Sequence, residues 1–161
     1  MTSQLGTTWA KWDLHVHTPS SPVHLYPGPE PWEPFLTDLE ALSTEYSCVG
    51  VNDYLFIDGY ERLLAERANG RLGNLSLLVP VIELRLPDFG GSNSQLSRIN
   101  LHVMFDPALG ADMIREQFLN ALSADFDLDP SVPGVTWSRT VTRDSLTSLG
   151  AAIRATLPTE R

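Results

Sequence analysis

The sequence predicts a mixed α/β fold built from parallel βαβ units. Stretches that read as strands, with alternating or continuous apolar residues, are separated by stretches in which apolar residues recur at helical spacing. A strand, a helix and a second strand in that order favour a parallel sheet with helical crossovers. Polar side chains gather near the ends of these strands, where α/β barrels build their sites.

The first strand is expected over residues 9–16, where apolar and polar residues alternate. Successive side chains of a strand point to opposite faces, so Asp13, His15 and His17 are expected on one face. Neutral imidazole is the commonest protein metal ligand, and two imidazoles at i and i+2 can converge on one ion. Thr18-Pro19 ends the strand because proline lacks the N–H that a ladder needs. A histidine-rich edge strand without a ligand is the competing interpretation.

A proline-rich loop over residues 19–34 follows, and its His24 is interpreted as a surface histidine. Residues 34–46 have the apolar spacing of a helix. A loop this long and this rich in proline indicates either a lid over a site or a mobile insertion.

The second strand, residues 48–51, ends in Asn52-Asp53-Tyr54. Asp53 lies at the carboxyl end of this strand, and both a structural and a chemical role are open for it. Asp58 is expected to cap the helix predicted over residues 59–68.

The third strand, residues 75–86, is apolar except for Glu83 and Arg85 near its end. A buried carboxylate is costly unless it is paired or bound to a metal. Two explanations are therefore open for Glu83, an ion pair with Arg85 or Arg98, and metal ligation.

A flexible loop is expected over residues 89–94, and a fourth strand over residues 98–105. Alternation places Asn100 and His102 on one face of that strand. Taken alone, His102 is typical of a core histidine held by a hydrogen bond.

Two further helices are predicted, over residues 111–122 and 144–156. Between them, the alternating aspartates of residues 125–129 are interpreted as a solvated acidic turn. This segment lacks the glycine and the terminal glutamate of an EF-hand loop.

Composition limits the classes of function. A net charge of −9 argues against broad, non-specific binding to a nucleic-acid backbone. The single cysteine, Cys48, excludes an intramolecular disulfide, and no apolar run is long enough to span a bilayer. Residues 1–8 are expected to be disordered and have no features of a secretory signal, so a cytoplasmic location is expected. No Gly-rich nucleotide-binding loop is present.

The string Asp13-Leu14-His15-Val16-His17-Thr18 resembles the first motif of the PHP (polymerase and histidinol phosphatase) superfamily of metal-dependent phosphoesterases. The longer string over residues 11–21 resembles the N-terminal PHP-like domain of TrlF-type AAA-like ATPases. The resemblance covers roughly residues 9–122. It implies that residues 9–161 are the N-terminal portion of a PHP-like domain, a partial distorted β/α barrel. The turn after the second strand usually carries an Asp-His pair in this family, and Tyr54 stands at the histidine position here.

The resemblance places metal ligands on Glu83 and His102 as well as on the first motif. The metal ligands are thus expected to be His15, His17, Glu83 and His102, and the candidate catalytic residues are Asp13 and Asp53. Nitrogen and oxygen donors of this kind suit Zn, Mn or Fe. No histidine follows His102, so the later ligands of the family are missing.

Three functions follow from these observations. The first is a metal-dependent phosphoesterase that hydrolyses a phosphorylated small molecule or a nucleic acid, with an AAA-like ATPase as partner in phage defence, as the resemblance implies. The second is a non-catalytic module that binds a metal or a phosphate. The third is a truncated remnant with an open sheet edge, which self-association or a partner would complete.

Overall fold

The structure, a computed structural model, describes residues 9–92, 95–127 and 136–157. The chain forms two compact units, Met1–Ala111 and Asp112–Arg161, called here the N-terminal and the C-terminal unit. Residues 1–8, expected to be disordered, and residues 130–135, expected to form a loop, lie outside the described residues. The mixed α/β class predicted from the sequence is confirmed.

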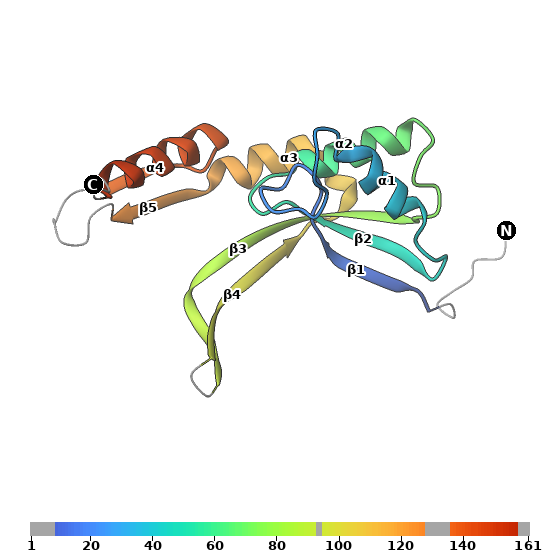
Figure 1. The fold of residues 1–161 in the computed structure, drawn as a ribbon, viewed down its shortest axis with the longest axis horizontal. Coiled ribbons are helices and arrows are strands. Elements are labelled where there is room, and N and C mark those ends of the chain that lie inside the picture. The colour runs from blue at the N-terminus through green and yellow to red at the C-terminus, as the bar shows by residue number, and fades with distance from the viewer. Residues whose placement is uncertain (1–8, 93–94, 128–135, 158–161) are drawn as a thin grey trace. The chain divides into compact units, whose positions relative to one another are not determined.

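A curled sheet of four strands forms the N-terminal unit (Figure 1). Its strands lie in the order β1 (Lys11–Val16), β2 (Tyr46–Asn52), β3 (Leu77–Ser92) and β4 (Gln95–Met104). The first three strands are parallel, as predicted, and β4 runs antiparallel to β3. The carboxyl ends of β1 and β2, the middle of β3 and the end of β4 therefore meet at one edge of the sheet.

Helices α1 (Trp32–Glu40) and α2 (Asp58–Ala68) are the two crossovers and lie together on one side of the sheet (Figure 1). Their buried apolar side chains are Phe35, Leu36, Leu39, Tyr60 and Leu63. Each such side chain contributes about 1.5–3 kcal/mol of transfer free energy when it leaves water. The N-cap of α2 is Ile57, so the prediction that Asp58 caps this helix is wrong. Asp58 occupies the first turn, where its charge interacts favourably with the helix dipole.

The sheet is also apolar on its other face. Cys48, Val79 and Val81 are buried there and pack with Leu14 and Leu77. Strands of a parallel sheet are commonly buried on both faces, which explains the continuous apolar runs of β2 and β3. Burial also raises the pKa of the Cys48 thiol, so this cysteine stays protonated at neutral pH.

Strands β3 and β4 continue beyond the rest of the sheet as a two-stranded hairpin (Figure 1). Phe89 pairs with Arg98 and Gly91 pairs with Leu96, so the loop predicted over residues 89–94 is wrong for residues 89–92. Gly91 has a φ of 142°, and a Cβ there would lie 2.1 Å from the carbonyl oxygen of Gln95. Gly91, which had indicated a loop, instead allows the two strands to approach closely.

A short 3-10 helix, η1 (Pro107–Leu109), leads to α3 (Gly110–Gln117), at whose start the C-terminal unit begins. The unit continues with η2 (Leu119–Ala121), β5 (Ser123–Asp127), β6 (Thr136–Thr140) and α4 (Arg143–Thr156). Residues 123–127 pair antiparallel with β6, so the acidic turn predicted over residues 125–129 is wrong for residues 125–127, and residues 128–129 lie outside the described residues. The last predicted helix is confirmed, and a capping box between Thr142 and Ser145 begins it. Among the described residues, no helix is long and apolar enough to cross a membrane.

Candidate metal centre

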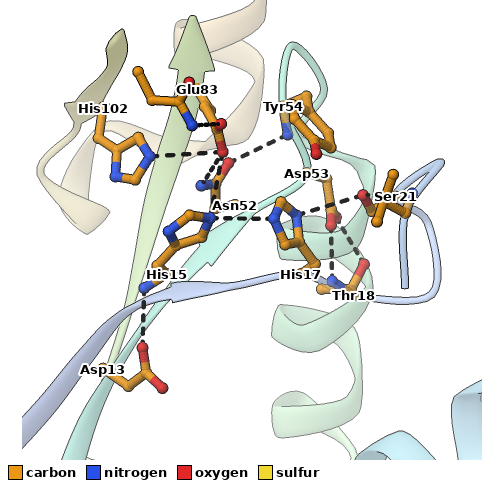
Figure 2. A network of polar contacts seen from close by, with 12 residues as sticks. Asp13, His15, His17, Thr18, Ser21, Asn52, Asp53, Tyr54, Glu83 and His102 are labelled. Carbon is orange, nitrogen blue, oxygen red and sulfur yellow. Dashed lines mark hydrogen bonds and ion pairs between the residues drawn. The ribbon is translucent and has the colours of Figure 1, made fainter. Parts of the chain in front are cut away.

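The pairing of β1 with β2 is irregular next to the site. The register shifts between Asp13 and Val16, so that two residues, Leu14 and His15, face the single residue Gly50. An extra residue of this kind re-aims the side chains of its strand. The backbone N–H of His15 donates to Asp13 Oδ1 at 3.1 Å, and the Asp13 side chain lies on the other side of β1 from the His15 ring (Figure 2). The prediction that Asp13 shares a face with both histidines is therefore wrong.

Three side chains from three strands converge at the edge of the sheet (Figure 2). His15 Nε2 lies 3.4 Å from Glu83 Oε2, and His102 Nε2 lies 3.6 Å from the same oxygen. Glu83 and His102 are direct partners in the β3–β4 ladder, which sets their separation. One ligand atom from each of the three residues lies within 4.8 Å of the other two. This group has the composition and spacing of a metal site.

His17 stands beside this group. Its Nε2 is 3.1 Å from His15 Nε2, and its Nδ1 is 3.4 Å from Ser21 Oγ. The His17 ring stacks on Tyr54, with ring centroids 5.0 Å apart and an interplanar angle of 27°. Two imidazole nitrogens this close either share a proton or face a common cation. The structure thus brings together three of the four ligands expected from the sequence, and it places His17 next to them, in contact with His15.

Glu83 is only 3 % exposed, and two amides hold its carboxylate. Asn52 Nδ2 donates to Oε2 at 2.8 Å, and Asn100 Nδ2 donates to Oε1 at 2.5 Å. Arg98, one of the expected ion-pair partners, lies over the Phe89 ring instead. Neutral amides orient a carboxylate without cancelling its charge, so a buried negative charge faces the histidines.

Sequence reasoning missed Asn52 and Asn100. A signal for each was present, since Asn52 is the polar residue that ends an apolar strand and Asn100 shares a strand face with His102. The amide of Asn52 also accepts, at 3.2 Å, the backbone N–H of Tyr54. Both asparagines are fixed by the strands that carry the ligands.

His102 supplies the test of whether a metal fits. Its Nε2 is buried and has no hydrogen-bond partner among the described residues. Buried polar atoms are nearly always paired, so an unpaired imidazole nitrogen that faces a carboxylate calls for an explanation. A cation bound between His15, Glu83 and His102 would satisfy this nitrogen and offset the charge of Glu83. The donor set therefore fits a metal ion.

Asp53 is 1 % exposed and holds the loop that follows β1. Its Oδ1 accepts the backbone N–H of Thr18 at 2.8 Å, and its Oδ2 accepts the hydroxyl of Thr18 at 2.7 Å. Both carboxylate oxygens are thus engaged by Thr18 and point to it (Figure 2). The pair forms a clamp between the ends of β1 and β2, called here the Thr18–Asp53 clamp.

Burial raises the pKa of the Asp53 carboxyl above its ordinary value, and the hydrogen bonds from Thr18 oppose this increase. The folded state therefore keeps the proton to a higher pH than the unfolded chain does. It follows that Asp53 makes the free energy of unfolding fall as pH rises from about 3.9 through the raised pKa. Asp53→Asn, which does not titrate, is expected to lack this fall. Urea denaturation of both proteins between pH 3.5 and 7, with a chelator present, measures the difference, and parallel stability curves would contradict it.

Comparison of the chain with known proteins identifies no similar protein. No family model, no curated protein and no solved structure matches the chain. The evidence for a metal centre is therefore the geometry of His15, Glu83 and His102.

Proposed function

We propose that the N-terminal unit is a metal-dependent phosphoesterase of the PHP kind. His15, Glu83 and His102 would hold one divalent transition metal, and His17 lies beside this group in contact with His15. The observation that carries this proposal is the convergence of the three side chains around the unpaired Nε2 of His102. Imidazole and carboxylate donors suit Zn, Mn or Fe, and the resemblance of residues 11–21 to PHP-like domains supports phosphoester hydrolysis.

When bound, such an ion lowers the pKa of a water molecule and polarises a phosphoryl oxygen. The residues of the chain orient the site. Asn52 and Asn100 fix the carboxylate of Glu83 in one rotamer. Ser21 Oγ lies 3.4 Å from Nδ1 of His17 and His15 Nε2 lies 3.1 Å from its Nε2, so the His17 ring is held beside the cluster by both of its nitrogens. The His15 side chain is 45 % exposed, so solvent and a substrate phosphate can reach the cluster from that side.

Hydrolysis of bis(4-nitrophenyl) phosphate by protein loaded with Mn or Zn tests this proposal. Glu83→Gln keeps the shape of the side chain and removes a charged ligand, and we expect it to lower kcat/KM about 100-fold or more. Glu116→Gln, the same change at an exposed position of α3, is the matched control and is expected to leave the rate unchanged. Equal rates for wild type and Glu83→Gln would place any hydrolysis outside this centre.

One observation favours a non-catalytic metal-binding module as the second candidate. Neither Asp13 nor Asp53, the expected catalytic residues, points to the cluster (Figure 2). The hydrolysis assay, together with the metal content of the protein, distinguishes the phosphoesterase from the non-catalytic module. Metal bound at one equivalent without turnover of the phosphodiester would favour the module.

A further inference from the structure

A cavity of about 470 Å³ lies beside the histidines, between the end of β1, the proline-rich loop and α1. Its volume is within the range of small-molecule sites, about 300–1,000 Å³. The apolar side chains that line it are Val16, Val23, Leu25, Phe35, Leu39 and Leu42. Leu39 and Phe35 belong to the core, whereas Leu25 is 92 % exposed on the loop. The buried side chains of α1 thus form the apolar floor of the cavity, and the proline-rich loop forms its outer wall.

Two carboxylates are the charged groups of this cavity. Asp13, which the register shift turns away from the metal cluster, lines it from β1, and Asp38 lines it from α1. The hydroxyl of Tyr26 donates to Asp38 Oδ2 at 2.8 Å and holds that carboxylate at the wall. No lysine or arginine is among the described residues that line the cavity. Apolar walls with negative groups favour a cationic or neutral organic group and disfavour an anion.

The same cavity is also lined by His15 and His17. A phosphoester whose phosphate lay at the metal cluster would have its organic group within reach of this cavity. The two histidines therefore lie between the metal cluster, where the phosphate of such a substrate would bind, and the cavity, where its organic group would bind.

We propose that this cavity is the subsite for the organic group of the substrate, and that it selects a ring-sized apolar group carrying an ammonium. The ammonium faces Asp13 and Asp38, and the ring lies against Phe35 and Leu39. The statement that this group belongs to a phosphoester rests on the proposed function, whereas binding of the amine itself does not. A nucleic acid is disfavoured, since its next phosphates would meet two carboxylates on a chain of net charge −9.

Binding of two probes to metal-free protein tests this subsite. Tyramine and 4-hydroxyphenylacetate share a phenol ring and carry opposite charges. By calorimetry, with mapping by amide chemical shifts, we expect tyramine to bind at least about tenfold more tightly, the effect of one charge-assisted hydrogen bond. Asp38→Asn, at an exposed position, is expected to remove most of this preference. Asp88→Asn, an exposed carboxylate of the hairpin, is the matched control and is expected to keep it.

A second variant tests the cavity itself. Val23 is 58 % exposed on the loop, so Val23→Trp fills the cavity without opening the core, and we expect it to abolish tyramine binding. Equal binding of both probes, no binding of either, or full binding to Val23→Trp would overturn the subsite. Metal content is measured separately on the same preparations. Protein that discriminates between the probes but binds no metal would retain the subsite and refute the phosphoesterase.

Discussion

Replacing His15 and His102 together with alanine is expected to abolish binding of a divalent transition metal. Each substitution removes one of the two imidazoles, whose Nε2 atoms lie 3.4 and 3.6 Å from Glu83 Oε2. Loss of a residue that merely supports a ligand commonly lowers metal affinity 10–100-fold, so loss of two ligands should exceed about 100-fold. Elemental analysis of the purified proteins and titration with Zn or Mn measure the effect.

His24→Ala is the matched control for this experiment. His24 lies on the proline-rich loop, outside the group of His15, Glu83 and His102, and its Nδ1 accepts the backbone N–H of Tyr26. We expect this variant to bind metal as the wild type does. Wild-type affinity in the double variant would show that the metal binds elsewhere, and a wild type that binds no metal after loading would refute the centre.

Gly59→Ala is expected to lower the free energy of unfolding by about 3 kcal/mol, the upper part of the range for overpacking a buried site. A Cβ at position 59 would lie 1.9 Å from Asp53 Oδ2 and 2.1 Å from Thr18 Oγ1. Both atoms belong to the buried Thr18–Asp53 clamp, so neither can move without breaking a hydrogen bond. Urea denaturation followed by circular dichroism measures the change.

Gly73→Ala is the control for the glycine variant. A Cβ at this position has no atom within 4 Å, so the same chemical change should alter stability by no more than about 0.5 kcal/mol. A loss below about 1 kcal/mol in Gly59→Ala would contradict the tight packing of α2 against the clamp.

The order of the strands and helices follows from periodicity, because helices α1 and α2 and strands β2 and β3 bury regular apolar patterns. Residues 89–92 and 125–127 were predicted as loops on local composition, yet both pair as strands. In the hairpin, Gly91 lies close to the backbone of β4, and the sequence around Gly91 does not reveal that β4 is its partner. Tertiary pairing thus overrides local propensity at these positions.

For the site, the spacing of His15 and His17 on one strand indicated a metal site. Glu83 and His102 were expected as ligands because of the resemblance to PHP-like domains. The orientation of Asp13 was not predictable, because it depends on one extra residue in the pairing of β1 with β2. Asn52 and Asn100 were missed for a different reason. Amides fill many roles in proteins, and only the structure shows that both donate to one buried carboxylate.

The Thr18–Asp53 clamp has a mechanical consequence for the molecule. Two buried hydrogen bonds join the loop after β1 to the turn after β2, and the backbone N–H of Glu83 donates to the carbonyl oxygen of Tyr54 at 2.9 Å. The ends of β1 and β2 and the middle of β3 are thereby linked in series, and separating one of them requires breaking a hydrogen bond to the next. Such linked segments open as a single cooperative unit. Any movement that displaces His17 should therefore carry Tyr54 and Glu83 with it, as parts of one body.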